Sequence, residues 1–221
     1  MKQGPVYQFA MKEIPALAEF WGIVSALSVV PQEFSLDSYR QHIAQTGLVE
    51  TCEAIERHPT AECIANELAL TERNRKNPQR SQQPLSLFQK KNGVVKLGPG
   101  MDRPTRIRMT QLLSEYFSDD VLESGNYLYP PGGFKEWHTN MVSVPGWRMY
   151  IVNKSPEGRS FFRYVDPETL QLETIWDQTG MINIFELRPD KPFWHAVKSI
   201  DAYRWSKGFV IPDDWRRTLG V

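Results

Sequence analysis

After residue 120 the sequence consists of short apolar segments divided by turn residues, and this pattern constrains the fold more than any other feature. The segments are rich in aromatic and β-branched side chains and often alternate between apolar and polar positions, as strands do. The six clearest are Tyr127–Tyr129, Trp147–Val152, Ser160–Val165, Gly180–Leu187, Trp194–Val197 and Tyr203–Ile211. Proline, glycine and aspartate separate them. Strands of this kind predict an all-β sandwich or barrel.

The first 120 residues favour helices instead. Leu17, Phe20 and Val24 recur at helical spacing after Pro15, which suits the first turn of a helix. The segment Ser35–Ser38 is expected to cap the start of the next helix, which continues through Tyr39–Ile43. Further helices are expected over Val49–Arg57, Cys63–Glu72 and Thr105–Phe117. We therefore expect an α+β protein in which residues 1–120, mainly helical, support a C-terminal β-barrel of residues 121–221, together forming one compact unit.

Composition narrows the classes of function. The 221 residues are 41% hydrophobic and 12% aromatic, enough for a packed core. The chain has 26 basic and 26 acidic side chains, and this zero net charge argues against a nucleic-acid binder held by bulk charge. The excess of basic residues between Arg73 and Arg108 is interpreted as a solvated loop.

The cysteines and the most apolar segment indicate the cellular setting. Cys52 and Cys63 fit neither a zinc pattern nor a disulfide framework, so reduced thiols and a cytoplasmic location are expected. The segment Ala16–Val30 contains Glu19 and is too short to cross a bilayer. We expect a buried or amphipathic helix there and no membrane partner.

Two of the four histidines have the spacing of a metal site. His138 and position 140 are two residues apart, so on an extended strand their side chains would point the same way, and His195 would arrive from a distant strand. Two imidazoles and one carboxylate suit Fe(II). Arg204 and Ser206 share one face of the strand that follows, where a guanidinium and a hydroxyl can hold a carboxylate.

This combination resembles the Fe(II)/2-oxoglutarate-dependent oxygenases. These enzymes have a double-stranded β-helix, a jelly-roll or cupin-like fold, with an H-x-D…H triad and an Arg-x-Ser after the second histidine. His195, eight residues, Arg204 and then Ser206 match that spacing, and the stretch from Tyr127 to Asn140, YLYPPGGFKEWHTN, resembles the strand and turn before the first histidine. The resemblance covers residues 104 to 211.

The resemblance implies a reaction and its cofactors. Fe(II) would be held by His138 and His195, with 2-oxoglutarate anchored by Arg204 and Ser206. Oxidative decarboxylation of 2-oxoglutarate would be coupled to hydroxylation of a C–H bond of a small-molecule substrate. Tyr127 or Tyr129 would donate a hydrogen bond to the cosubstrate.

Asn140 departs from the family pattern, which has an aspartate or glutamate at this position. Four interpretations are open. The amide oxygen of Asn140 binds the metal; Asn140 lies beside a metal held by two histidines, leaving a position for water or halide; Glu136, two residues before His138, supplies the carboxylate; or the site is degenerate. We favour iron bound by His138 and His195 with Asn140 in or next to the coordination sphere.

Two other functions compete with hydroxylation. Halogenation or another radical reaction would follow from an altered iron centre, whereas a cupin-like binding module would keep the fold without the metal. Arg148 and Arg163 are minor candidates for contact with an anionic substrate, although strand arginines more often cover an exposed face.

Overall fold

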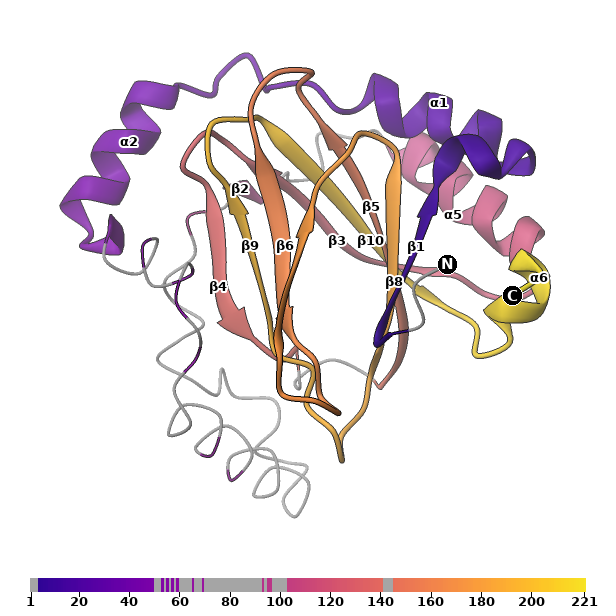
Figure 1. The fold of residues 1–221 in the computed structure, drawn as a ribbon. Coiled ribbons are helices and arrows are strands. Elements are labelled where there is room, and N and C mark those ends of the chain that lie inside the picture. The colour runs from indigo at the N-terminus through magenta and orange to yellow at the C-terminus, as the bar shows by residue number, and fades with distance from the viewer. Residues whose placement is uncertain are drawn as a thin grey trace, which may run out of the picture.

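The fold is seen in a computed structural model, which describes residues 4–49, 103–140 and 145–221 together with isolated positions between 53 and 96 (Figure 1). The helices expected over Val49–Arg57 and Cys63–Glu72 lie largely outside the described residues, and Cys52 and Cys63 lie wholly outside them. The remaining expectations can be compared with the structure.

Two antiparallel sheets face each other (Figure 1). The six-stranded sheet, here the major sheet, has the order β1-β8-β5-β10-β3-β2, and the four-stranded minor sheet has the order β4-β9-β6-β7. The strands of the major sheet are β1 Val6–Ala10, β8 Met181–Leu187, β5 Gly146–Lys154, β10 Arg204–Ile211, β3 Leu122–Tyr129 and β2 Val95–Lys96. Those of the minor sheet are β4 Phe134–His138, β9 His195–Ser199, β6 Ser160–Val165 and β7 Leu172–Trp176.

Helices cover the outer face of the major sheet. The helical segments are η1 Met11–Glu13, η2 Pro15–Leu17, α1 Ala18–Ala26, α2 Leu36–Gln45, α5 Arg103–Phe117 and α6 Trp215–Leu219. Helices α1, α5 and α6 lie together on the side of the major sheet away from the minor sheet, whereas α2 lies beside the minor sheet (Figure 1). The largest hydrophobic cluster joins helices to sheet, with Phe20 of α1, Leu113 of α5 and Phe209 of β10 all fully buried.

Alternation along each strand separates this helix-covered core from the space between the sheets. In β8, Ile182 and Ile184 pack in the cluster under the helices, whereas Phe185 packs with Phe162 and Phe193 in a second cluster. Successive strand residues point to opposite faces, so each strand of the major sheet contributes to both regions. The space between the sheets holds the pocket described below.

The local signals read from the sequence have definite outcomes. All six predicted strands are present, and Ser35 caps α2 by accepting a hydrogen bond from the Ser38 N–H at 3.2 Å. Pro15 begins η2, directly before α1. The sequence analysis assigned no strand to β1, β2 or β7, and β1 is notable because it brings the N-terminal region into the major sheet by pairing with β8.

The expected closed barrel is not found. Within the described ranges, backbone pairing leaves two separate sheets, with β1 and β2 at the edges of one and β4 and β7 at the edges of the other. The sandwich alternative is the one observed. The division at residue 120 stays a prediction.

No helix in the described part of the chain is long and apolar enough to span a membrane.

Candidate active site

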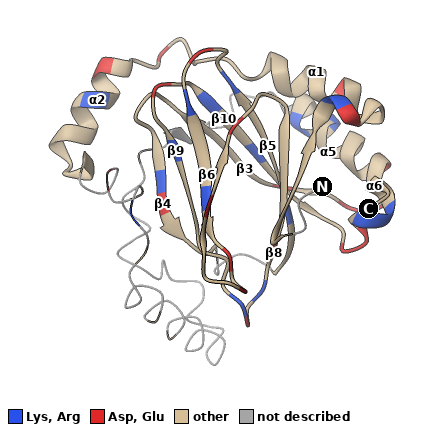
Figure 2. Ribbon diagram, in the orientation of Figure 1, with Lys and Arg blue, Asp and Glu red and all other residues tan. Residues whose placement is uncertain are grey.

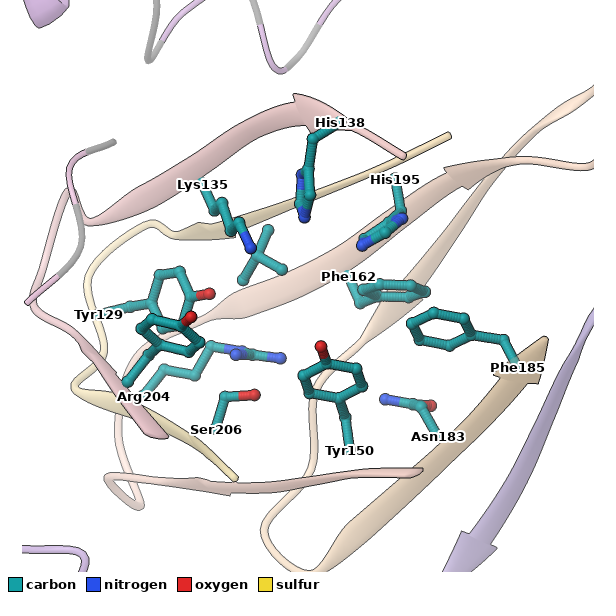
Figure 3. Close-up of a pocket in the computed structure, with 12 residues that line it drawn as sticks. Tyr129, Lys135, His138, Tyr150, Phe162, Asn183, Phe185, His195, Arg204 and Ser206 are labelled. Carbon is teal, nitrogen blue, oxygen red and sulfur yellow. The ribbon is translucent and has the colours of Figure 1, made fainter. Parts of the chain in front are cut away.

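A pocket between the two sheets is lined by twelve residues that come from seven different strands (Figure 3). They are Tyr127, Tyr129, Lys135, His138, Tyr150, Phe162, Asn183, Phe185, His195, Val197, Arg204 and Ser206. Both predicted metal-binding histidines, both residues of the predicted carboxylate anchor and both candidate tyrosines are among them. The tertiary structure therefore brings these six sequence-predicted side chains to one place.

The two histidines lie side by side on neighbouring strands. His138 ends β4, His195 begins β9, and the two are directly paired in the ladder. Their ring centroids are 4.1 Å apart. The Nδ1 of His138 lies 2.6 Å from the carbonyl oxygen of Glu136, and the Nδ1 of His195 lies 2.9 Å from that of Phe193. A carbonyl oxygen only accepts, so each Nδ1 carries the proton and each Nε2 is unprotonated.

The surroundings keep both imidazoles neutral. Burial lowers the pKa of His195 to about 3, and the nearby Lys135 ammonium adds to this effect. Burial also lowers the pKa of His138 well below its usual value, again reinforced by Lys135. Neutral imidazole with a free Nε2 lone pair is the form that binds a metal ion.

Asn140 contacts His195 from beyond the end of strand β4, whereas the sequence predicted that it would lie on the strand. Strand β4 ends at His138, and Asn140 has a φ of 55°, in the left-handed region, so the two residues do not share a strand face as expected. Asparagine tolerates this conformation better than most residues. Its Nδ2 nevertheless donates a hydrogen bond to the Nε2 of His195 at 3.1 Å.

The separation of Asn140 and His195 suits two ligands of one metal ion. Donor atoms bound at right angles, with bonds of about 2.1 Å, lie about 3 Å apart. Rotating the amide by 180° would place Oδ1 where Nδ2 now lies. After that rotation the amide oxygen of Asn140 would lie about 3.1 Å from the Nε2 of His195, although Asn140 is not itself among the residues that line the pocket.

Glu136 does not join the histidines, contrary to one of the four interpretations. The β4–β9 register shifts between Lys135 and His138, which places three residue steps of β4 opposite two of β9. Lys135 and His138 consequently both line the pocket, and Glu136 is buried elsewhere. Among the described residues, no three histidine, cysteine, aspartate or glutamate side chains form a group that could hold a metal.

Arg204 is already paired with an acid that the sequence analysis missed. Its Nε donates to Asp177 Oδ2 at 2.8 Å and its Nη2 to Asp177 Oδ1 at 3.4 Å, and both side chains are almost fully buried. Its Nη1 is buried with no hydrogen-bond partner among the described residues. In the sequence Asp177 follows the missed strand β7 and looks like an ordinary turn residue, so no local signal marked it.

The other predicted anchors take up positions consistent with hydrogen-bond donation. Arg204 is paired in register with Tyr129, and Ser206 with Tyr127. Burial raises the pKa of both tyrosines, so both phenols stay protonated at neutral pH. The Arg204 guanidinium lies over the Tyr129 ring, 5.0 Å from its centroid. Arg204, Tyr129 and the hydroxyl of Ser206 lie together at one end of the pocket (Figure 3).

Three polar pocket residues were not predicted from the sequence. Asn183 accepts a hydrogen bond from Gln8 Nε2 at 3.2 Å through its Oδ1, which leaves its amide nitrogen toward the pocket (Figure 3). Tyr150 stacks on Phe185 with centroids 5.5 Å apart and directs its hydroxyl inward (Figure 3). Lys135 is the third. All three follow the strand alternation, but only the tertiary structure shows which face is the pocket.

The two minor arginine candidates lie outside the pocket. Arg148 is buried and donates to the carbonyl oxygen of Trp147 at 3.2 Å. Arg163 donates to Thr174 Oγ1 at 2.9 Å and lies over the Phe161 ring, and neither arginine is in the pocket lining. These contacts give both arginines a structural role.

Comparisons with known proteins give only remote similarities. No protein-family model matches the chain, and no curated protein matches it in sequence. A solved structure of a prolyl-4-hydroxylase from Pseudomonas putida matches with a TM-score of 0.38 and 13% identity, covering 75% of this chain and 99% of that protein. An oxidoreductase of the 2OG-Fe(II) oxygenase family from Burkholderia pseudomallei matches with a TM-score of 0.33 and 11% identity, covering 48% and 52%.

Not every structural match is an oxygenase. Peruvianin-I, a cysteine peptidase from Thevetia peruviana latex, matches with a TM-score of 0.30 and 14% identity, covering 39% of this chain and 48% of the peptidase. All these TM-scores are below 0.5, so we base no functional assignment on them. The assignment rests on the side chains of the pocket.

Proposed function

We propose that this protein is a non-haem Fe(II)/2-oxoglutarate-dependent oxygenase that couples decarboxylation of 2-oxoglutarate to hydroxylation of a C–H bond in a small-molecule substrate. One observation carries the proposal: two neutral imidazoles, each with an unprotonated Nε2, share a pocket with the Arg204–Ser206 pair. The two facing sheets are consistent with a double-stranded β-helix, the fold that the sequence resemblance implies.

The donor set suits a divalent metal ion. The Nε2 atoms of His138 and His195 would be two ligands, and the carbonyl oxygens that receive their Nδ1 protons would fix both ring orientations, as in many histidine metal sites. The amide oxygen of Asn140 would be a third, neutral ligand. Without a carboxylate the site would bind Fe(II) more weakly than a two-histidine, one-carboxylate site.

The opposite end of the pocket suits the distal carboxylate of 2-oxoglutarate. No described residue accepts a hydrogen bond from Arg204 Nη1, and the hydroxyls of Ser206 and Tyr129 are close by in the lining. A buried guanidinium nitrogen that lacks a partner is costly, and a carboxylate oxygen is the acceptor that would satisfy it. Asp177 would hold the guanidinium in place from the other side.

Iron bound at the histidines, together with 2-oxoglutarate, would supply the oxygen activation that none of the twenty side chains provides. The residues of this chain would bind and orient. Phe162 and Phe185 would form the apolar wall beside His195, with their ring centroids 5.6 and 5.3 Å from the imidazole. This wall would exclude water from the reacting centre.

Asn140 also supports a second candidate, halogenation or related radical chemistry. If Asn140 does not coordinate, a ligand position is left for chloride. Chloride-dependent product formation, absent in sulfate buffer of equal ionic strength, would favour this second function over hydroxylation.

The deciding experiment is an anaerobic Fe(II) titration in the presence of 2-oxoglutarate. We expect the weak visible charge-transfer band of 2-oxoglutarate chelated to iron, and we expect His195→Ala to abolish both the band and metal binding. His42→Ala is a matched control, because His42 lies on α2 and is not in the pocket lining. Folded wild-type protein that binds no Fe(II) would refute the proposal and leave a binding module.

A further inference from the structure

Arg204 brings little net positive charge to the pocket. Asp177 contacts both Nε and Nη2 of its guanidinium, and the exposed fractions of the two side chains are 2% and 0%. A guanidinium and a carboxylate this close form a nearly neutral unit when seen from the pocket. Arg204 therefore provides a directed donor, Nη1, but not an uncompensated charge.

Lys135 is a pocket cation that has no acidic partner among the described residues. Its side chain extends from β4 toward the pocket, with Nζ between His138 and the tyrosines (Figure 3). Basic positions occur within the strands of both sheets, β4 among them (Figure 2). No carboxylate in the described part of the chain forms a salt bridge with Lys135, and the ammonium instead lies 5.4 Å from the centroid of the Tyr127 ring.

The pocket lining has the chemistry of an anion site. Among the described residues, the lining contains two cations and no aspartate or glutamate. Around them are hydrogen-bond donors: the hydroxyls of Ser206 and three tyrosines and the amide nitrogen of Asn183. Burying an ammonium without a partner is unfavourable, and a bound anion would offset this cost.

The local backbone places Lys135 here in a specific way. In a regular strand, residues 135 and 138 would face opposite sides, because side chains alternate with a period of two. The register shift between them puts both on the pocket side. The irregularity thus brings the free ammonium beside the histidine pair.

We propose that Lys135 supplies the net positive charge that holds the anionic cosubstrate, and that Arg204 orients the cosubstrate through its Nη1 donor. The ligand class is a small dicarboxylate, such as a 2-oxo acid with a second carboxylate. The identity of the ligand in this inference rests on the proposed function. The separate roles of Lys135 and Arg204 rest instead on the contacts of Lys135 and Asp177.

The test is calorimetric binding of 2-oxoglutarate to the Mn(II)-loaded protein without oxygen. Lys135→Gln keeps a hydrogen-bond donor but removes the charge, and we expect 2-oxoglutarate affinity to fall about 10- to 100-fold while Mn(II) affinity is retained. Lys198→Gln is the matched control: Lys198 is also buried, lies on the adjacent strand β9 and is not in the pocket lining. Unchanged affinity in Lys135→Gln would overturn the inference.

A charge-relocation variant separates charge from shape. Adding Asp177→Asn to Lys135→Gln leaves Arg204 uncompensated, so the pocket regains one net positive charge. We expect this double variant to recover most of the lost 2-oxoglutarate affinity. If it folds, as shown by its circular dichroism, and recovers nothing, Lys135 acts through shape and the inference fails.

Failure of this inference is distinguishable from failure of the proposed function. The same titrations are repeated on metal-free protein with 2-oxoglutarate and succinate. If wild type binds a dicarboxylate but no metal, and Lys135→Gln weakens that binding, the iron proposal fails and the Lys135 inference stands. If wild type binds metal but no dicarboxylate under either condition, the Lys135 inference fails.

Discussion

At the residue scale, the site depends on a few atoms whose hydrogen bonds fix their chemistry. The Nδ1 protons of His138 and His195 go to backbone carbonyl oxygens, which commits each Nε2 to the pocket. Asn140 then meets the Nε2 of His195 at 3.1 Å from a left-handed backbone conformation. In the proposed metal site, the identity of residue 140 would therefore set the charge of the ligands.

Asn140→Asp should tighten divalent-metal binding. An aspartate would place a negative oxygen where the amide is now, converting a neutral donor set into a charged one, and we expect affinity to rise by about tenfold or more. Co(II) titration followed by its visible absorption measures this. Asn153→Asp adds the same charge outside the pocket lining and should change nothing. Equal affinities in all three proteins would show that residue 140 does not face the metal.

Arg204→Met should cost stability as well as cosubstrate binding. The sequence alone predicts only a raised 2-oxoglutarate requirement, but the substitution leaves the Asp177 carboxylate buried without its partner. Breaking a buried pair from one side costs about 3–5 kcal/mol. Urea denaturation of Arg204→Met, Asp177→Asn and the double variant measures the coupling. We expect the double variant to be more stable than the sum of the single losses predicts, and strict additivity would contradict the pairing.

At the element scale, strand irregularities and alternation decide which side chains meet. Strand β10 sends Arg204 and Ser206 into the pocket and Phe209 into the core under the helices. In strand β4, Lys135 and His138 both face the pocket only because the register shifts between them. Lys207 of β10 is almost fully buried outside the pocket lining and donates to Asn126 Oδ1 at 3.0 Å.

Lys207 gives the protein a pH-dependent stability at alkaline pH. Burial lowers its pKa to about 8, partly opposed by Glu123, whereas in the unfolded chain the value returns to about 10.5. Between these values the unfolded state binds more protons, so this contribution to stability rises as the pH rises from about 8 to 10.5. Thermal unfolding of wild type and Lys207→Met across this range should show wild type gaining up to about 3 kcal/mol relative to the variant. Parallel pH profiles would contradict the burial of the charged amine.

At the scale of the whole molecule, the N-terminal region and the strand core share one hydrophobic cluster. Phe20 and Leu113 from the helices pack with Ile184 and Phe209 from the major sheet. Strand β1 adds backbone pairing to β8, and Gln8 of β1 bonds to the pocket residue Asn183. The predicted regions 1–120 and 121–221 are therefore expected to unfold together.

Cooperative unfolding can be tested by two probes. Tryptophan fluorescence and far-ultraviolet circular dichroism should give coincident urea transitions, because the shared core couples helices to sheet. Phe20→Ala should shift both midpoints together, with a loss of about 3–5 kcal/mol. Separate transitions, or a Phe20→Ala effect confined to one probe, would mean that the two regions are independent domains.

Sequence patterns were enough to predict the strand-rich core and six of the pocket residues, because these depend on local periodicity and on fixed spacings. Alternation and turn residues predicted the six strands, and the spacing of His138, His195, Arg204 and Ser206 predicted that they meet. The family resemblance suggested Tyr127 and Tyr129. These signals lie within single strands or motifs.

Only the tertiary structure decided the electrostatics of the site. Asp177, which lies 27 residues before Arg204 in the sequence, neutralises its charge. The register shift in β4 places Lys135, and not Glu136, on the pocket side with His138. Neither effect leaves a local pattern, because pairing across strands and the side of a bulge depend on the neighbouring strand. The physical reason is the same for both effects. The partner of a buried charge, and the side of a sheet to which a side chain points, are set by three-dimensional neighbours that sequence periodicity does not specify.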